Sequence, residues 1–153
     1  MYNFKNQKIQ ELYNYLIEDF SWNDLYYDED NSIKRLKSYI DNFNSKDWID
    51  FELTINQWDS GILRLLAELI TYDNSPKYPH EYIYCLAFVN CNHTDSFELL
   101  YGLSMELNPH KVLDENLLAD VKTRAHSFWD GNTNENIEYT KRLLDKKLKL
   151  TKQ

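Results

Sequence analysis

Two cysteines and a histidine lie close enough in the sequence to suggest a metal site or a thiol nucleophile. Cys85, Cys91 and His93 have the spacing C-x5-C-x-H. Zinc sites usually use closer ligand pairs and need a fourth ligand, and a nucleophilic thiol needs a neighbouring base. Cys85 also lies within the apolar run HEYIYCLAFV, where a free cysteine packs as a small hydrophobic side chain. We therefore expect Cys85 to belong to the core and the protein to bind no metal and no cofactor.

Carboxylates offer a second kind of chemistry, because Asp24, Asp28 and Asp30 are spaced in a way that suggests a cation-binding loop. A calcium loop of the EF-hand type needs a glycine at its sharp turn, and no glycine lies between Met1 and Ser60. The glycines at 61, 102 and 131 stand alone, so the sequence contains no glycine-rich phosphate loop. With no catalytic motif, we expect no catalytic residues and a protein that is not an enzyme.

The segment WNDLYYDEDNS, residues 22–32, combines large aromatic rings with concentrated negative charge. In one interpretation, Trp22, Leu25 and one tyrosine pack beneath the first two helices, and the acids form a solvated loop that caps the second helix. In the other, exposed tyrosines beside carboxylates form a contact surface, because aromatic rings dominate binding hot spots and carboxylates steer a basic partner into place. The candidate partner-binding residues of this acidic–aromatic segment are Trp22, Asp24, Tyr26, Tyr27, Asp28, Glu29 and Asp30.

A second candidate patch of the same character lies at another expected helix junction. It consists of Tyr72, Asp73, Tyr78, His80 and Glu81. The sequence does not show whether the two patches form one surface. Both predict a basic protein as the partner.

The charge of the chain, −8, favours such a partner, because an acidic surface repels nucleic acid and anionic membranes. The tail from about residue 141 has a net charge of about +5, which leaves a net charge of about −13 for the rest of the chain. The cations of the tail suit the negative end of the dipole of a last helix. No apolar run approaches the ~20 residues of a membrane span, and the opening MYNFKNQKIQ lacks the pattern of a signal peptide. We therefore expect a cytoplasmic protein with reduced thiols.

The spacing of apolar residues predicts the helices that hold these candidates. The expected inward stripes are Ile9, Leu12, Tyr13, Leu16, Ile17 and Phe20; Ile33, Leu36, Ile40 and Phe43; Ile62, Leu63, Leu65, Leu66, Leu69 and Ile70; Phe97, Leu100, Leu103 and Leu107; Leu117, Val121, Ala125 and Phe128; and Ile137, Leu144 and Leu148. The residues expected to begin helices are Asp30, Asn31 or Ser32; Asp59 or Ser60; Asp95 with Glu98, which resemble a capping box; Asp114; and Asn132 with Glu135. Gly131 fits the C-cap of the helix that starts at Asp114.

Two segments, residues 48–56 and 82–89, fit either a helix or a strand. In the first, alternate residues are apolar as in a strand, yet Trp48, Phe51, Ile55 and Trp58 share one helical face. We expect helices in both segments, because no turn chemistry surrounds the first and Pro79 suits a helix start before the second. The result is an all-α chain of about eight helices in a single domain, residues 1–153, arranged as a HEAT-like helical stack or an irregular helical bundle.

A small acidic helical chain of this kind, with the repeat-like helix QWDSGILRLLAELI, resembles bacterial immunity proteins of polymorphic toxin systems, including contact-dependent inhibition. The resemblance rests on general character rather than on a motif, so it assigns no functional residue. It implies a protein that binds a cognate toxin domain and covers its cationic active site without chemistry of its own. A helical adaptor or scaffold domain is the main alternative, followed by a small enzyme without a legible motif and by a DNA mimic. The oligomeric state does not follow from the sequence.

Overall fold

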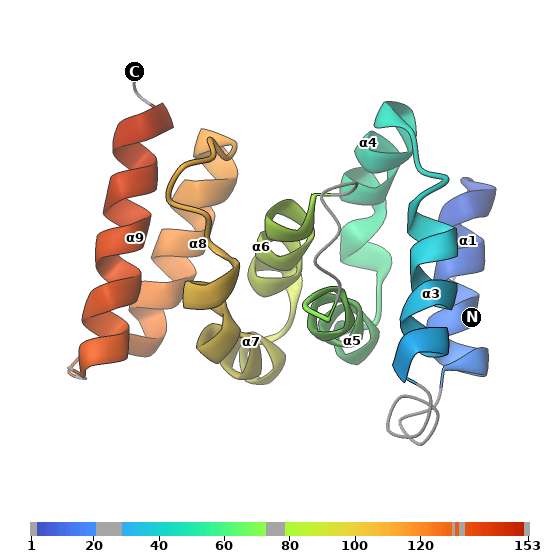
Figure 1. Ribbon diagram of the computed structural model, residues 1–153, viewed down its shortest axis with the longest axis horizontal. Coiled ribbons are helices and arrows are strands. Elements are labelled where there is room, and N and C mark those ends of the chain that lie inside the picture. The colour runs from blue at the N-terminus through green and yellow to red at the C-terminus, as the bar shows by residue number, and fades with distance from the viewer. Residues whose placement is uncertain (1–2, 21–28, 73–78, 130, 132–133, 152–153) are drawn as a thin grey trace. The chain divides into compact units, whose positions relative to one another are not determined.

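The computed structural model of the protein confirms the all-α fold (Figure 1). It describes residues 3–20, 29–72, 79–129, 131 and 134–151. These residues form eight α-helices, a π-helical turn η1 and a 3-10 turn η2, and they contain no strand. The elements are α1 (Gln7–Asn14), η1 (Tyr15–Asp19), α3 (Glu29–Ile40), α4 (Ser45–Thr54), η2 (Ile55–Gln57), α5 (Ser60–Ile70), α6 (His80–Asn90), α7 (His93–Glu106), α8 (Glu115–Trp129) and α9 (Glu135–Thr151). None of the helices in the described part of the chain is long and apolar enough to cross a membrane.

The chain divides into two compact units, an N-terminal unit of residues 1–79 and a C-terminal unit of residues 80–153. In the N-terminal unit, η1 packs against α1 and α5, and α1 also contacts α3 and α4. In the C-terminal unit, α6 packs against α7 and α8, and α9 lies beside α8 and contacts α7 (Figure 1). The single domain expected from the sequence stays a prediction.

The first segment that fits either a helix or a strand is helical, as expected, and forms α4 and η2. Phe51 is fully buried, whereas Ile49 and Leu53, which would share its face in a strand, are 59% and 71% exposed. The ring of Phe51 lies edge-on to Trp48 and Trp58, with centroids 5.8 and 5.4 Å apart. The helical face therefore builds the aromatic core of the N-terminal unit.

The first helix departs from the predicted stripe at its end. Ile17 was expected to point inward but is 45% exposed, whereas Tyr15 is buried. The reason is η1, whose wider turn rotates these residues relative to an α-helix. The Tyr15 hydroxyl donates to the carbonyl oxygen of Ser32 at 3.0 Å, and its ring stacks on Tyr39 with centroids 5.1 Å apart. Contacts with α3 thus accompany the change in register, and apolar spacing does not reveal them.

Two of the predicted helix starts are confirmed. The Asp59 carboxylate accepts hydrogen bonds from the amides of Gly61 and Ile62 at the start of α5. Asp114 accepts one from the amide of Leu117 at the start of α8, at 2.9 Å. Gly131, which follows α8, has a φ of 79°, the left-handed conformation that favours glycine after a helix end.

The predicted starts of α3 and α7 need correction. Helix α3 begins at Glu29, so Asp30, Asn31 and Ser32 lie within it rather than before it. Helix α7 begins at His93, because Asn92 accepts the cap hydrogen bond three residues before the predicted box of Asp95 and Glu98. Helix α9 begins at Glu135, as predicted, and Asn134 caps it through the amide of Ile137. The predicted Asn132 lies outside the described residues. In α7 and α9 an asparagine offers the same chemistry at a different position, so the sequence contains competing caps.

Asp47 anchors the start of α4. Its carboxylate accepts hydrogen bonds from the backbone amide of Asn44 at 2.9 Å, the side-chain amide of Asn6 at 2.9 Å and the ammonium of Lys8 at 2.7 Å. Burial raises the pKa of Asp47, but these three donors outweigh burial and lower that pKa from 3.8 to about 2. The buried charge therefore ties α1 to α4.

We expect the Asp47 charge to stabilise the protein by about 2 kcal/mol near neutral pH. Because the folded pKa is lower than the unfolded one, this contribution is present above about pH 4 and is lost as the pH falls to about 2. Urea unfolding of the parent and of Asp47→Asn across this range measures it. The difference in unfolding free energy should shrink as the pH falls, and a constant difference would contradict the role of the charge.

The second ambiguous segment is the buried helix α6, which is the core of the C-terminal unit. Cys85 is 0% exposed and belongs to the core, as expected. Tyr84 donates its hydroxyl proton to the carbonyl oxygen of Leu99 at 2.5 Å. Its ring approaches α7 so closely that a Cβ at Gly102 would collide with it. Glycine at position 102 thus permits the tight contact between α6 and α7.

The buried face of α7 lies one residue away from the predicted stripe near the start of the helix. Ser96 is 0% exposed, while Phe97, which was expected to be inward, is 41% exposed. The Ser96 hydroxyl donates to the carbonyl oxygen of Phe88 at 2.6 Å and accepts from Arg124 at 3.0 Å. These hydrogen bonds make burial of a serine favourable, so apolar spacing alone gave the wrong register here.

Candidate functional site

The acidic–aromatic segment was the first surface predicted from the sequence. Trp22, Asp24, Tyr26, Tyr27 and Asp28 lie outside the described residues, so their role stays a prediction. Glu29 and Asp30 are the first two residues of α3.

The second predicted patch is divided between the two units. Tyr72 follows α5 in the N-terminal unit and is 50% exposed, whereas His80 and Glu81 begin α6 in the C-terminal unit. Asp73 and Tyr78 lie outside the described residues. The carboxylate of Glu81 is committed to contacts within its own unit, which the sequence did not indicate.

Glu81 belongs to a buried ion pair with Lys147 of α9. The Lys147 side chain is 0% exposed, and its ammonium lies 2.9 Å from the Glu81 carboxylate. The same ammonium donates to the carbonyl oxygens of Asn108 and Lys111, both at 2.6 Å, and the second Glu81 oxygen accepts from the backbone amide of Asn108. All three donors of the ammonium therefore have acceptors, and the pair joins α6, α9 and the segment after α7.

Other titratable groups lie close to this ion pair. Burial raises the pKa of the Cys85 thiol, and the charge of Glu81 raises that pKa further. Burial also raises the pKa of Glu106, although the charge of His80 lowers it. A buried thiol with a raised pKa is a poor nucleophile and a poor metal ligand at neutral pH. The cluster therefore fits a structural role better than a catalytic one.

The metal site considered from the sequence gains no support from side-chain positions. Cys85 and Cys91 are both buried, whereas His93 is exposed at the start of α7 and its ring lies 4.5 Å from that of Phe128. Within the described residues, no group of three or more histidine, cysteine or acidic side chains is placed to hold a metal ion.

A surface groove in the C-terminal unit has the chemistry of a binding site. It has a volume of about 410 Å³, and we call it the α7–α9 groove. Its lining includes Phe97, Tyr101 and Met105 of α7, Phe128 of α8, and Asn136 and Ile137 of α9. Tyr101 and Met105 are 73% and 79% exposed, so one wall presents aromatic and methionine side chains to solvent. Aromatic residues and methionine are enriched in protein interfaces.

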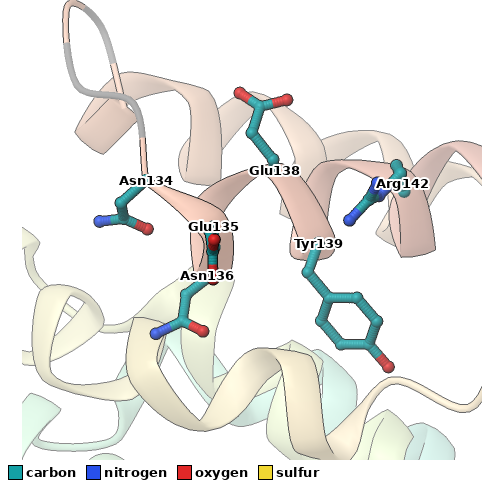
Figure 2. Close-up of a pocket in the computed structure, with 6 residues that line it drawn as sticks. All are labelled: Asn134, Glu135, Asn136, Glu138, Tyr139 and Arg142. Atoms are coloured by element: carbon teal, nitrogen blue, oxygen red, sulfur yellow. The ribbon is translucent and has the colours of Figure 1, made fainter.

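A second, open depression of about 690 Å³ continues this surface across the first turns of α9 (Figure 2). It shares Asn134 and Asn136 with the groove. Figure 2 shows Asn136 and Tyr139 projecting on one side of α9 and Glu138 on the opposite side. Tyr139 is 49% exposed, so α9 adds a fourth large exposed side chain to Phe97, Tyr101 and Met105.

The sequence contains a signal for this groove besides the single inward stripe predicted for α7. Phe97, Tyr101 and Met105 recur every four residues, which places a second apolar stripe on α7 beside the buried one. Comparisons of the chain with protein-family models, with curated proteins and with solved structures found no match.

Proposed function

We propose that the protein is a non-catalytic binding protein that neutralises a cognate bacterial toxin by covering its cationic active site, as an immunity protein does. Helix α7 carries this proposal. It exposes Tyr101, Met105 and the carboxylate-bearing Glu98, and it contains no lysine or arginine. Exposed rings supply contact area, and carboxylates attract a basic surface.

The charge of the whole chain supports the same function. Toxins that cut nucleic acid bind phosphates through cationic clefts, and a protein with a net charge of −8 is attracted to the same field. Part of the basic tail is used within the C-terminal unit, since Lys147 is buried and Lys141 lies 3.4 Å from Glu138. These pairings reduce the positive charge that α9 presents to a partner.

The titratable cluster supports the non-catalytic part of the proposal. The ammonium of Lys147 is saturated by protein acceptors, and the thiol of Cys85 is inaccessible. Groups held in this way stabilise a fold rather than exchange protons with a substrate.

The decisive experiment starts from the gene that precedes the one encoding this protein. The C-terminal domain of its product is expressed with and without the chain, and toxicity, complex formation and the toxin's own activity are measured. We expect a toxin domain whose activity is lost in a stoichiometric complex, with cell growth restored. A neighbouring product that is not a toxin, or a toxin that stays active when mixed with the chain, would refute the proposal.

The acidic–aromatic segment provides a further prediction. Changing Asp24, Asp28, Glu29 and Asp30 together to Asn should slow association with the toxin by about tenfold at low salt, because four steering charges are removed. Melting temperature should change little, apart from a small loss at the start of α3. Stopped-flow mixing at low and high salt measures the rate. Equal rates for parent and variant at low salt would exclude this segment from the interface.

A further inference from the structure

The exposed stripe of α7 is held in place by a chain of aromatic rings. Phe88, in the core of α6, lies 6.4 Å from Phe128 of α8, which lies 5.6 Å from Phe97 of α7. Phe97 then contacts Tyr101 edge-on, with centroids 5.8 Å apart. A solvent-exposed ring that packs against such a chain loses less conformational entropy when a partner binds than an unsupported side chain does.

The walls of the groove differ in chemistry. The α7 wall is aromatic and apolar, whereas the α9 wall contributes the side-chain amides of Asn136 and of Asn134, whose oxygen caps α9, beside Ile137. Carboxamides donate and accept hydrogen bonds, so they suit the backbone of a bound segment. The groove therefore fits a polypeptide that places an apolar side chain against α7 and its backbone against α9.

The charges near the groove indicate which polypeptide fits. On α7, Glu98 stands three residues before Tyr101 and seven before Met105, on the same helical face, and it is exposed. On α9, Glu135 and Glu138 line the adjoining depression together with Arg142, and the ammonium of Lys141 lies 3.4 Å from the Glu138 carboxylate. Counted together, the carboxylates of Glu98, Glu135 and Glu138 outnumber the cations Lys141 and Arg142 by three to two near the groove. This balance favours a segment with lysine or arginine around its apolar residue.

We infer that the α7–α9 groove binds a basic segment of a partner protein by seating one large apolar side chain against Tyr101 and Met105. The inference rests on the proposed function and assigns its contact surface to the C-terminal unit. The partner presents a leucine, isoleucine, phenylalanine or methionine, flanked by lysine or arginine within one helical turn.

The test uses phage that display random peptides of about 12 residues, a length that spans a groove-bound segment. They are selected on the full-length chain, and the enriched peptides are synthesised with a fluorescent label. We expect enrichment of one large apolar residue flanked by cations. Anisotropy should give an affinity at least about 30-fold lower for the Tyr101→Ser, Met105→Ser double variant, since both side chains are central contacts.

The matched control is the double variant Ile49→Ser, Leu53→Ser on α4. These two residues have the same four-residue spacing and similar exposure, 59% and 71%, so the variant should fold and bind the peptides as the parent does. Circular dichroism checks that both double variants are folded. Enrichment of acidic or purely polar peptides, or equal affinity for the Tyr101→Ser, Met105→Ser variant, would overturn the inference.

The remaining outcomes separate this inference from the proposed function. If the chain is a dimer that the Tyr101→Ser, Met105→Ser change dissociates, a second copy occupies the groove and the inference fails. If a toxin is neutralised equally by this variant, the inference fails while the proposed function stands. If the groove captures basic peptides but the chain neutralises no toxin, the proposed function fails and the groove remains a site for basic segments.

Discussion

Replacing Lys147 with methionine should lower the free energy of unfolding by about 3–5 kcal/mol, the loss expected when one partner of a buried ion pair is removed. The Lys147 side chain is 0% exposed and that of Glu81 is 13% exposed. Methionine has a similar length but no donor, so the Glu81 carboxylate and the carbonyl oxygens of Asn108 and Lys111 lose the ammonium that they share. Urea denaturation followed by circular dichroism gives the value.

The neighbouring lysine offers a matched control. Lys146 is exposed on the same helix, so Lys146→Met should change the unfolding free energy by no more than about 0.5 kcal/mol. Adding Glu81→Leu to Lys147→Met should recover part of the loss, because no unpaired carboxylate remains. Equal stability of the Lys146 and Lys147 variants would show that the ion pair does not hold α9 to α6.

Replacing Phe51 with alanine should cost about 3–5 kcal/mol, because the change leaves a cavity where a fully buried ring stood. The edge-on contacts with Trp48 and Trp58 are lost with it. Thermal and urea unfolding of the variant measure the loss. Near-ultraviolet circular dichroism should also weaken, since the two tryptophans lose a rigid neighbour.

Leu53→Ala is the control for this second prediction. Leu53 is 71% exposed on the outer face of α4, so its truncation should cost no more than about 0.5 kcal/mol. In a strand, positions 51 and 53 would share a face, and the two variants would lose similar stability. A similar loss at both positions would therefore contradict the helix as well as the packing.

Substitutions in the α7–α9 groove should have the opposite effect to those in the core, changing binding rather than stability. Tyr101 and Met105 are large but exposed, so their replacement should affect a partner's affinity and leave stability almost unchanged. The contrast between these residues and Phe51 separates apolar side chains that hold the fold together from apolar side chains that are available for binding.

Helical periodicity determined the elements of this protein because it is a local property of the sequence. Leu63, Leu66 and Leu69 recur with the spacing of one helix face, and all three are buried. Caps such as Asp59 and Asp114 act on amides two or three residues away, so they could also be predicted from the sequence. The same reasoning placed Cys85 in the core, since apolar residues surround it in the sequence.

Tertiary contacts decided the features that depend on residues far apart in the chain. In the sequence, Lys147 is one cation of a basic tail. It becomes a buried group only because Glu81, 66 residues earlier in the chain, lies beside it in the fold. Ile17 is exposed where contacts with α3 accompany the π-helical turn, and Phe97 is exposed because Arg124 and the Phe88 carbonyl favour burial of Ser96.

Some features of the candidate binding surface follow from the sequence, and others follow only from the packing of the helices. From the sequence alone come the acidic charge, the abundance of tyrosine and the segment 22–30, which lies mostly outside the described residues and stays a prediction. The α7–α9 groove exists only because α8 brings Phe128 against α7 and α9 supplies the opposite wall. Local spacing determines which face of a helix is apolar, but the packing of neighbouring helices decides whether that face is covered or left open to a partner.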